Sequence, residues 1–305
     1  MKRQPLTRVV AVLTAILTTV ALSACGGGDP LSQDSEAAGD SIVVGSANFP
    51  ENQLLAEIYA QALKAKGVKV TTKLNISSRE TYLPALQKGE INLIPEYTGN
   101  LARYLSKDAD ITTEQTALES LKKALPKGLV AMTPAPAQDK DSIVVTKETA
   151  DKYGLKSIAD LSKASSQLVL GGPPEFKTRI DGVDGLKRVY GLTFKEFKAL
   201  DAAGPLTVQA LKNGQVQAAN LFSTDPNVAA NNFVVLDDPK NLFGAQNVVP
   251  VITESKATDQ VKQVLDAVSA KLETEVLTGL VKKVVIDTED ASAVAEQWLK
   301  ENQLI

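Results

Sequence analysis

This sequence of 305 residues contains no histidine and only one cysteine. Without histidine, the chain cannot use a Ser-His-Asp or Cys-His nucleophile, the usual catalytic zinc ligands, or the commonest general base near neutral pH. A single cysteine excludes an intramolecular disulfide and any metal site built from several cysteines. Most familiar enzyme classes are therefore excluded, and we expect no catalytic residues, no metal and no cofactor.

Aromatic residues are also scarce, at 5% of the chain, whereas 44% of the residues are hydrophobic and 23% are charged. This balance supplies enough apolar surface for a core and excludes a disordered chain, a collagen-like rod and a coiled coil. The length allows one large domain or two of about 130 residues each. The chain is therefore expected to be globular.

The first residues are typical of a secretory signal. Val9 to Leu22 is an apolar stretch of 14 residues without a charge, preceded by three basic residues, Lys2, Arg3 and Arg8. Such a stretch is short for a bilayer span and typical of the apolar region of a signal peptide. Leu22 to Cys25 resembles the lipobox of bacterial lipoproteins, in which the cysteine becomes the acylated first residue of the mature chain.

We therefore predict a signal peptide over residues 1–24 and lipidation of Cys25. A flexible tether, which begins with three glycines, is predicted over residues 25–40. The folded body would then be anchored by lipid at the extracytoplasmic face of the cell membrane. The alternative is an ordinary signal peptide with a chance cysteine at its end.

Charge along the rest of the chain is dispersed. Removing three of the 33 basic residues with the signal leaves 30 against 36 acidic residues, a net charge of about −6. There is no run of like charges and no second apolar segment long enough to span a membrane. Nucleic-acid binding is therefore not expected.

Strand-like and helix-like patterns alternate after residue 40. Residues 51–66 place apolar side chains on one helical face and end at Gly67, while strands are expected at 41–46, 68–74 and 91–94, with a second helix at 80–88. This βαβ alternation favours a mainly parallel sheet covered by helices on both faces. In such sheets ligands bind outside the carboxyl ends of the strands.

A proline-rich segment, Thr133 to Ala137, interrupts this rhythm and predicts an extended linker. A second α/β series follows, with strands at 142–146, 167–170 and 233–236 and helices around 147–153 and 206–212. A return strand at Asn247 to Thr253 and helices through Trp298 complete the chain. We predict two lobes, residues 41–134 plus 247–305 and residues 135–246, joined by two hinge crossings around a cleft.

A similarity between two segments of the chain supports two lobes. Ala85 to Asn92 resembles Ala210 to Gln217 at an offset of 125 positions, and each is a helix end, a glycine and an entering strand. Eight residues after each glycine stands an aromatic residue, Tyr97 in one case and Phe222 in the other. Either these two rings approach the cleft from opposite sides, or they are core residues.

Three segments carry a resemblance to a known family: Ile42 to Phe49, Leu86 to Asn92 and Pro95 to Gly99. They resemble the substrate-binding proteins of osmoprotectant ABC importers, and the resemblance covers roughly residues 41–300. It implies a two-lobed type II periplasmic-binding-protein fold that binds glycine betaine, choline or a related quaternary amine. It also implies permease and ATPase subunits as partners and a monomeric binding protein that presents its ligand to them.

The resemblance further implies an aromatic cage, which binds a quaternary ammonium by cation–π attraction because that group has no N–H to donate. Tyr97 aligns with one cage tyrosine and Phe222 with another, so two rings of four remain. Ile143 and Gln246 stand where the family has the other two tyrosines. Phe49 and Tyr82 are candidates to replace the missing rings.

Polar positions of the family site also differ here. Asn100 replaces a threonine and Ala47 replaces a lysine, whereas Arg179 aligns with the arginine that pairs with a ligand carboxylate. We expect an altered ligand, with Ile143 enlarging the apolar side of the site and amide hydrogen bonds from Gln246 and Asn100. Glycine betaine is expected to bind weakly or not at all.

Several readings stay open. Arg179 can be a ligand, surface or interlobe arginine, and Asp141 can bind an ammonium, cap a turn or form an interlobe salt bridge. Asn48 to Glu51 predicts a helix start whose free N–H groups favour an anion. Gly171 to Pro174 indicates a turn after a strand.

Rival functions are a sensor or scaffold lipoprotein on the same fold, binding of a different metabolite, and a carboxylate hydrolase.

Overall fold

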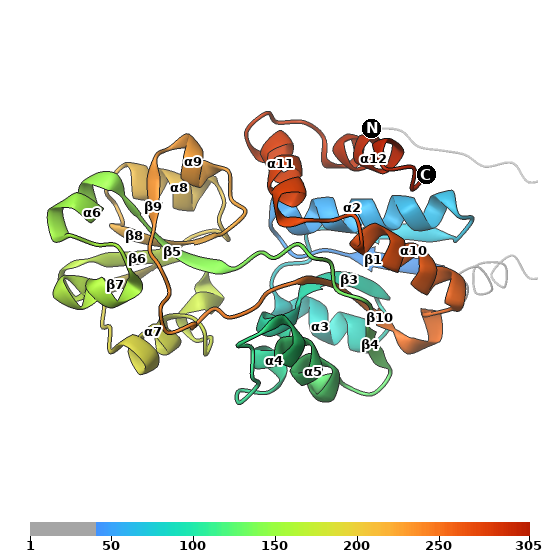
Figure 1. Ribbon diagram of the computed structural model, residues 1–305, viewed down its shortest axis with the longest axis horizontal. Coiled ribbons are helices and arrows are strands. Elements are labelled where there is room, and N and C mark those ends of the chain that lie inside the picture. The colour runs from blue at the N-terminus through green and yellow to red at the C-terminus, as the bar shows by residue number, and fades with distance from the viewer. Residues whose placement is uncertain (1–40) are drawn as a thin grey trace, which may run out of the picture. The chain divides into compact units, whose positions relative to one another are not determined.

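The computed structural model describes residues 41–305, which contain two five-stranded sheets, each covered by helices (Figure 1). The predicted signal peptide, Cys25 and the tether lie outside the described residues. Within residues 41–305, no helix has the length and apolar character that crossing a membrane requires.

The first sheet has the strand order β2-β1-β3-β10-β4. Its strands are β1 (Ile42–Gly45), β2 (Val70–Lys73), β3 (Leu93–Tyr97), β4 (Leu129–Ala131) and β10 (Val248–Thr253). β1 runs parallel to β2 and β3, whereas β10 runs antiparallel to β3 and β4. All five residues of β3 are buried, as expected of a central strand that is covered on both faces.

Helices cover both faces of this sheet (Figure 1). They are α2 (Pro50–Ala65), α3 (Arg79–Gln87), α4 (Thr98–Leu105), α5 (Glu114–Ala124), α10 (Asp259–Ser269), α11 (Thr274–Val285) and α12 (Ala291–Glu301). The three C-terminal helices contact α2 and share one core with it, which includes Tyr59 and Trp298. The C-terminal helices therefore return to the first sheet, and the rings of Tyr59 and Trp298 are core residues.

The second sheet has the order β7-β6-β8-β5-β9. Its strands are β5 (Asp141–Thr146), β6 (Val169–Gly172), β7 (Glu196–Ala199), β8 (Ala218–Phe222) and β9 (Phe233–Val235), and its helices are α6 (Lys147–Tyr153), α7 (Val183–Tyr190), α8 (Pro205–Lys212) and α9 (Asn227–Ala230). β6 runs parallel to β7 and β8, while β5 is antiparallel to β8 and β9. Separate apolar cores pack against its two faces.

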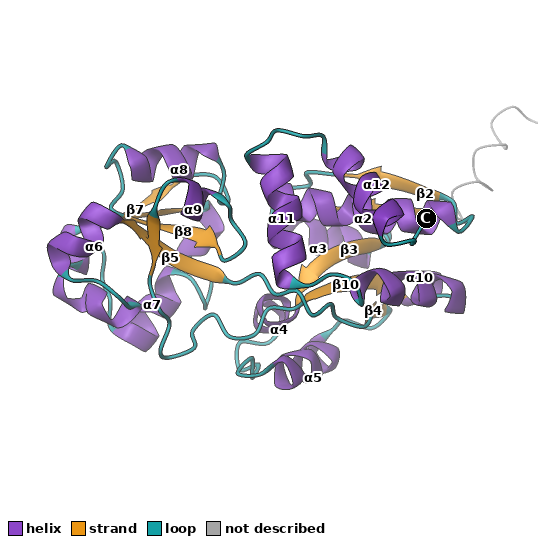
Figure 2. Ribbon diagram, turned by 45° about the horizontal axis from the view of Figure 1, so that its top comes forward, coloured by secondary structure: helices purple, strands orange, loops and turns teal. Residues whose placement is uncertain are grey.

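Two irregular segments connect the sheets, one between β4 and β5 and the other between β9 and β10, and both views show them side by side (Figures 1 and 2). An antiparallel bridge between Gln138 and Asn247 joins them. We call β1–β4, β10 and their helices the first half, and β5–β9 and their helices the second half. The α/β architecture with two crossings is therefore confirmed, while the exact lobe boundaries stay a prediction.

Candidate functional site

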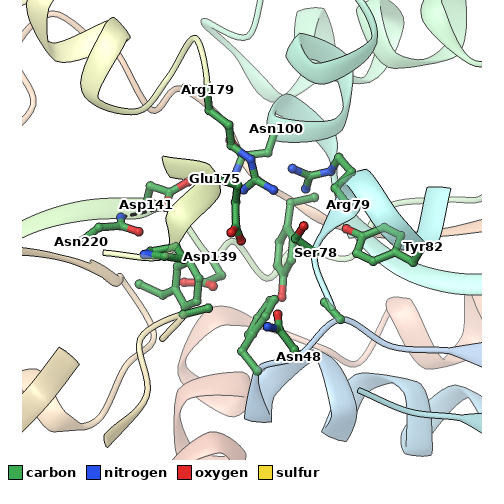
Figure 3. A pocket seen from close by; sticks show the side chains of 16 residues that line it. Asn48, Ser78, Arg79, Tyr82, Asn100, Asp139, Asp141, Glu175, Arg179 and Asn220 are labelled. Carbon is green, nitrogen blue, oxygen red and sulfur yellow. Dashed lines mark hydrogen bonds between the residues drawn. The ribbon is translucent and has the colours of Figure 1, made fainter. Parts of the chain in front are cut away.

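A hollow lies between the halves, where several strands end. β3 ends at Tyr97, β8 ends at Phe222, and the loops after β1 and β6 reach the same place. The hollow has about 550 Å³ of empty volume, part of it open to solvent. We call it the ring chamber. Its main polar and aromatic walls are Asn48, Phe49, Arg79, Tyr97, Asn100, Asp139, Asp141, Glu175, Arg179, Asn220 and Phe222 (Figure 3).

Three aromatic rings from both halves meet on this wall. The ring centroid of Phe49 lies 4.9 Å from that of Phe222 and 6.2 Å from that of Tyr97. Phe49, the residue before α2, therefore lies between Tyr97 and Phe222, the two rings that follow the similar segments in the sequence. Of the open alternatives, Phe222 lies at the chamber, whereas Tyr97 lines the chamber and also belongs to the apolar core of the first half. Phe49 adds a third ring.

Tyr82 lines the chamber but serves mainly a buried ion pair. Its hydroxyl donates to Glu96 Oε1 at 2.7 Å, and Arg79 donates to both oxygens of Glu96 at 2.8 and 2.7 Å. The backbone N–H of Tyr97 donates to the same carboxylate at 3.0 Å. Arg79 and Glu96 are 6% and 1% exposed. This cluster holds the wall that carries the Tyr97 ring.

A chain of amide and carboxylate groups crosses between the halves. Asn100 Nδ2 donates to Asp141 Oδ2 at 3.0 Å, and Asn220 Nδ2 donates to Asp141 Oδ1 at 2.9 Å. Behind Asn100, Gln246 donates to Asn100 Oδ1 at 2.9 Å and accepts from its backbone N–H at 2.8 Å. Asp141 therefore joins the halves through an amide, not through a salt bridge. Burial, reinforced by the charge of Asp181, raises the pKa of Asp141.

Two residues expected at the ligand do not line the ring chamber. Ile143 is fully buried in the core of the second sheet, so it does not enlarge the apolar side of the site as expected. Gln246 is fully buried and reaches the site only through Asn100. Its side chain packs close to Gly99, where an added Cβ would lie 2.4 Å from the carbonyl oxygen of Ala245 and 2.7 Å from Gln246 Nε2. This close approach explains the glycine at the start of α4.

Arg179 connects the halves as well as lining the chamber. Its Nε and Nη2 donate to the carboxylate of Glu80, on α3, at 3.2 and 3.0 Å. Burial alone would raise the pKa of Glu80, but the hydrogen bond and charge of Arg179 lower it to about 2. Arg179 therefore forms the interlobe contact that was one of its alternatives. Its pairing with a ligand carboxylate stays a prediction.

Two carboxyl groups, those of Glu51 and Asp139, are buried where α2 meets the segment between β4 and β5. Glu51 Oε1 accepts from the Tyr97 hydroxyl at 2.7 Å, and Glu51 also accepts from the Thr224 hydroxyl of the second half. Asp139 accepts from the Thr224 N–H at 3.1 Å. Burial raises the pKa of Glu51, although its hydrogen bonds to Thr224, Tyr97 and Asp139 act in the opposite direction. Burial and the charge of Glu51 raise the pKa of Asp139 well above its usual range. We expect the pair to share a proton.

Replacing Asp139 by asparagine tests this sharing. A group whose pKa is raised on folding stabilises the protein below its unfolded pKa and loses that contribution as the pH rises through the folded pKa. The unfolded values are 3.8 for aspartate and 4.5 for glutamate, so the wild type loses stability upward from about pH 4. Asp139→Asn keeps a donor without titrating, so its melting temperature should exceed that of the wild type by at least about 2 °C at pH 8.

Thermal unfolding followed by circular dichroism from acid to mild alkali measures this difference. The matched control is Asp151→Asn, because Asp151 is an exposed carboxylate on α6 that pairs with Lys147. A gain for Asp139→Asn that is equal at every pH, or absent at the highest pH, would contradict a shared proton.

The free N–H groups at the start of α2 were expected to favour a bound anion, but the structure gives this helix end a carboxyl group of its own. Phe49, not Asn48, is the N-terminal capping residue and makes no side-chain cap bond, and Pro50 is the first helical residue. The buried Glu51 already places a carboxyl group in the first turn. The positive end of the helix therefore has its own negative partner.

Sequence reasoning missed Glu51, Asp139 and Glu175 as parts of the site. Asp139 lies two residues before Asp141, the first residue of β5, and this spacing indicates one shared face in extended chain. The turn expected over Gly171–Pro174 is instead the end of β6 and the start of a 3-10 helix, Pro174–Lys177. Glu175 lies in that helix, just beyond the carboxyl end of β6, where ligands are expected in this class of sheet. Among the described residues, no group of three histidine, cysteine or acidic side chains is placed to hold a metal.

The two sheets, the two crossings and the cleft between them define a type II periplasmic-binding-protein fold. The chain belongs to the family of substrate-binding domains of ABC-type glycine betaine transport systems (OpuAC), whose model matches residues 40–301. It is therefore a substrate-binding protein of this class of transporter, as the sequence resemblance predicted. Proteins of this family are extracytoplasmic and work with permease and ATPase components.

Relatives of the chain agree with this assignment. The glycine betaine-binding protein YehZ of Escherichia coli is 31% identical over 278 residues, which cover 87% of this chain and 91% of the relative. The carnitine transport binding protein OpuCC of Listeria monocytogenes is 25% identical, covering 86% and 87%. A crystal structure of a glycine betaine/carnitine/choline ABC transporter protein shares the fold, with 24% identity and a TM-score of 0.68 over 87% of this chain and 99% of that one.

Proposed function

We propose that the ring chamber captures a small organic cation of the quaternary-ammonium class. The observation that carries this proposal is the meeting of Phe49, Tyr97 and Phe222 from both halves in a chamber that is also lined by carboxyl groups. Ring faces attract a cation that has no N–H to donate. Recognition then depends on three rings, two of them in the aligned cage positions and the third from Phe49.

The charges around the chamber favour the same class of ligand. Three acidic residues line it, Asp139, Asp141 and Glu175. The two lining cations, Arg79 and Arg179, are each engaged by a glutamate outside the chamber. Because Asp139 and Glu51 share one proton, that pair keeps one negative charge, to which Asp141 and Glu175 add. Negative charge at the chamber therefore exceeds the positive charge that has no ion-pair partner among the described residues, and a bound cation would offset that excess.

Ligand capture would be coupled to closure of the halves. Bonds already cross between them at Arg179–Glu80, Asn100–Asp141 and Thr224–Glu51. A ligand held by rings from both halves adds differential affinity for the closed state, and only such an affinity shifts the equilibrium. The closed form would be the one presented to the permease.

The proposal includes a finer placement in the cell. The protein would act as a monomer, anchored to the membrane by a lipid on Cys25, with ATP hydrolysis left to its partner subunits and no catalysis of its own. The signal-like residues 1–24 and the tether after Cys25 support this placement. Mass spectrometry of the membrane fraction would find a diacylglyceryl group on Cys25, and Cys25→Ser would release the protein.

Calorimetry with glycine betaine, choline and carnitine tests the ligand class. Two of the four cage rings are missing, and Phe49 supplies only one in their place. Each cation–π contact contributes about 0.5–2 kcal/mol, so glycine betaine should bind with a dissociation constant above about 1 µM. Phe222→Ala should weaken the best ligand about tenfold or more, because it removes one of three remaining rings. Sub-micromolar binding of glycine betaine would overturn the expected change of ligand.

The matched control is Phe194→Ala, because Phe194 is a partly buried ring of the second half that does not line the chamber. It should leave the affinity unchanged. A ligand whose affinity is indifferent to both substitutions would show that the rings around Phe222 are not the binding site.

A further inference from the structure

A second hollow adjoins the ring chamber on the side of α4. The two share Arg79, Asn100 and Arg179 as walls, so they are neighbouring compartments of one cleft. The second hollow has about 640 Å³ of empty volume, part of it open to solvent. Its other charged walls include Arg103 and Lys107, and we call it the arginine chamber.

The arginine chamber carries an excess of positive charge. Four cations line it, Arg79, Arg103, Lys107 and Arg179, against the two carboxylates Glu80 and Asp181. Arg79 pairs with Glu96 outside the chamber, and Glu80 is taken by Arg179. The charges without an ion-pair partner at 4 Å or less among the described residues are then those of Arg103, Lys107 and the carboxylate of Asp181.

Among these groups, Arg103 is a part-buried cation without an ion-pair partner in the described part of the chain. It lies near the end of α4, and one of its guanidinium nitrogens donates to the carbonyl oxygen of Leu242. That bond fixes the side chain but does not neutralise it. Burial lowers the pKa of Arg103, with the charge of Asp181 acting in the opposite direction, so an added anion would relieve a partly desolvated cation.

The two chambers therefore differ in the sign of their available charge. The ring chamber offers three rings and an excess of carboxyl groups, and the arginine chamber offers two cations unpaired within residues 41–305, Arg103 and Lys107, against the one unpaired carboxylate of Asp181. Tyr104, which is 40% exposed and lies 5.9 Å from the Arg79 guanidinium, forms an apolar and aromatic side of the second compartment. A molecule that spans both compartments would meet negative charge at one end and positive charge at the other.

We infer that the two chambers form one elongated site for a zwitterion whose carboxylate lies several bonds from its ammonium group. Building on the proposed function, the rings hold the ammonium end, while Arg103 and Lys107 hold the carboxylate. Arg179 stays paired with Glu80 at the passage between the compartments. A compact zwitterion such as glycine betaine keeps both charges within one compartment and leaves Arg103 and Lys107 unused.

Calorimetry with a graded series of ligands tests this inference. The probes are glycine betaine, trimethylammonio-butyrate and trimethylammonio-hexanoate, in which the carboxylate is progressively farther from the nitrogen, and choline, which has no carboxylate. The longer zwitterions should bind at least about tenfold more tightly than glycine betaine, because they add a charge-assisted hydrogen bond in a partly desolvated place.

Variants then locate the carboxylate end. Arg103→Gln should weaken the tightest long zwitterion about tenfold, and Lys107→Gln about threefold because its charge is exposed. Neither should alter choline binding. Lys107→Gln also keeps the test valid if Arg103→Gln fails to fold, since Lys107 lies exposed beyond the end of α4. The control is Lys122→Gln, an exposed lysine on α5 that lines neither chamber.

The outcomes separate the two proposals. If ammonium compounds bind but neither chain length nor the two variants changes their affinity, the elongated site is wrong and the ring chamber stands. If no ammonium compound binds the wild type, the proposed function fails and the elongated site fails with it.

Discussion

Replacing Arg79 by methionine should lower the free energy of unfolding by about 3–5 kcal/mol, because it leaves the Glu96 carboxylate buried without its counter-ion. The pair is nearly inaccessible to water and bidentate, with two N–H donors of Arg79 on the two oxygens of Glu96. Only the Tyr82 hydroxyl and the Tyr97 N–H would then remain on that carboxylate. Urea unfolding near neutral pH measures the loss.

A double variant separates the buried charge from the lost packing. Arg79→Met with Glu96→Gln removes both charges. The amide oxygen can still accept from the Tyr97 N–H, and the amide NH2 can donate to the Tyr82 hydroxyl oxygen, so most of the loss should be recovered. Arg188→Met is the control, since Arg188 donates to the Ile180 carbonyl in an exposed place. A loss below about 1 kcal/mol for Arg79→Met would mean that the pair contributes no more than a surface salt bridge.

Tyr97 should separate stability from ligand binding when its hydroxyl and its ring are removed in turn. Tyr97→Phe deletes the donor that serves the buried Glu51, which should lower the free energy of unfolding by about 1.5–3 kcal/mol while leaving ligand affinity within about threefold. Tyr97→Leu also deletes the ring beside Phe49, so it should weaken the best ligand tenfold or more.

Chemical unfolding and calorimetry on the same two variants check both effects. Tyr153→Phe is the control, because Tyr153 lies on α6 of the second half and does not line the ring chamber. If Tyr97→Phe weakens ligand binding as strongly as Tyr97→Leu, the hydroxyl or the carboxyl group behind it contacts the ligand, and the ring is not the main contact.

Stability and binding are linked through β3. Glu96 and Tyr97 are consecutive on this fully buried strand, so their side chains point to opposite faces. Glu96 anchors Arg79 on one side, while the Tyr97 ring faces the chamber with its hydroxyl on Glu51. The ring wall is therefore positioned by buried carboxylates on both sides of one strand, which preorganises it for a ligand.

Much of the fold could be predicted from local sequence. The apolar periodicity of α2 and its glycine stop, the runs that became β1, β3 and β10, and the proline-rich crossing are properties of short segments. Segments with weaker signals were missed, such as α5, which buries only Ala117 and Leu121. Short exposed helices leave few apolar positions from which to read a period.

Ile143 illustrates why the site was harder to predict. Asp141 and Ile143 share a face of β5, which makes a common role plausible in sequence. Two residues of strand, however, cover about 7 Å, and over that distance β5 passes from the chamber into the core of the second half. Alternation indicates the face of a strand, but not where along it the cleft ends.

By itself, the sequence determined the family, the α/β architecture with two crossings, and the shortage of rings and of histidine that favours binding over catalysis. Only the tertiary structure decided the partners: Arg179 with Glu80, Arg79 with Glu96, Glu51 with Asp139, and Gln246 behind Asn100. Each of these pairs joins residues of different segments of the chain, and Arg179 with Glu80 joins the two halves. Their contacts depend on how packed elements meet in space, which no local periodicity encodes.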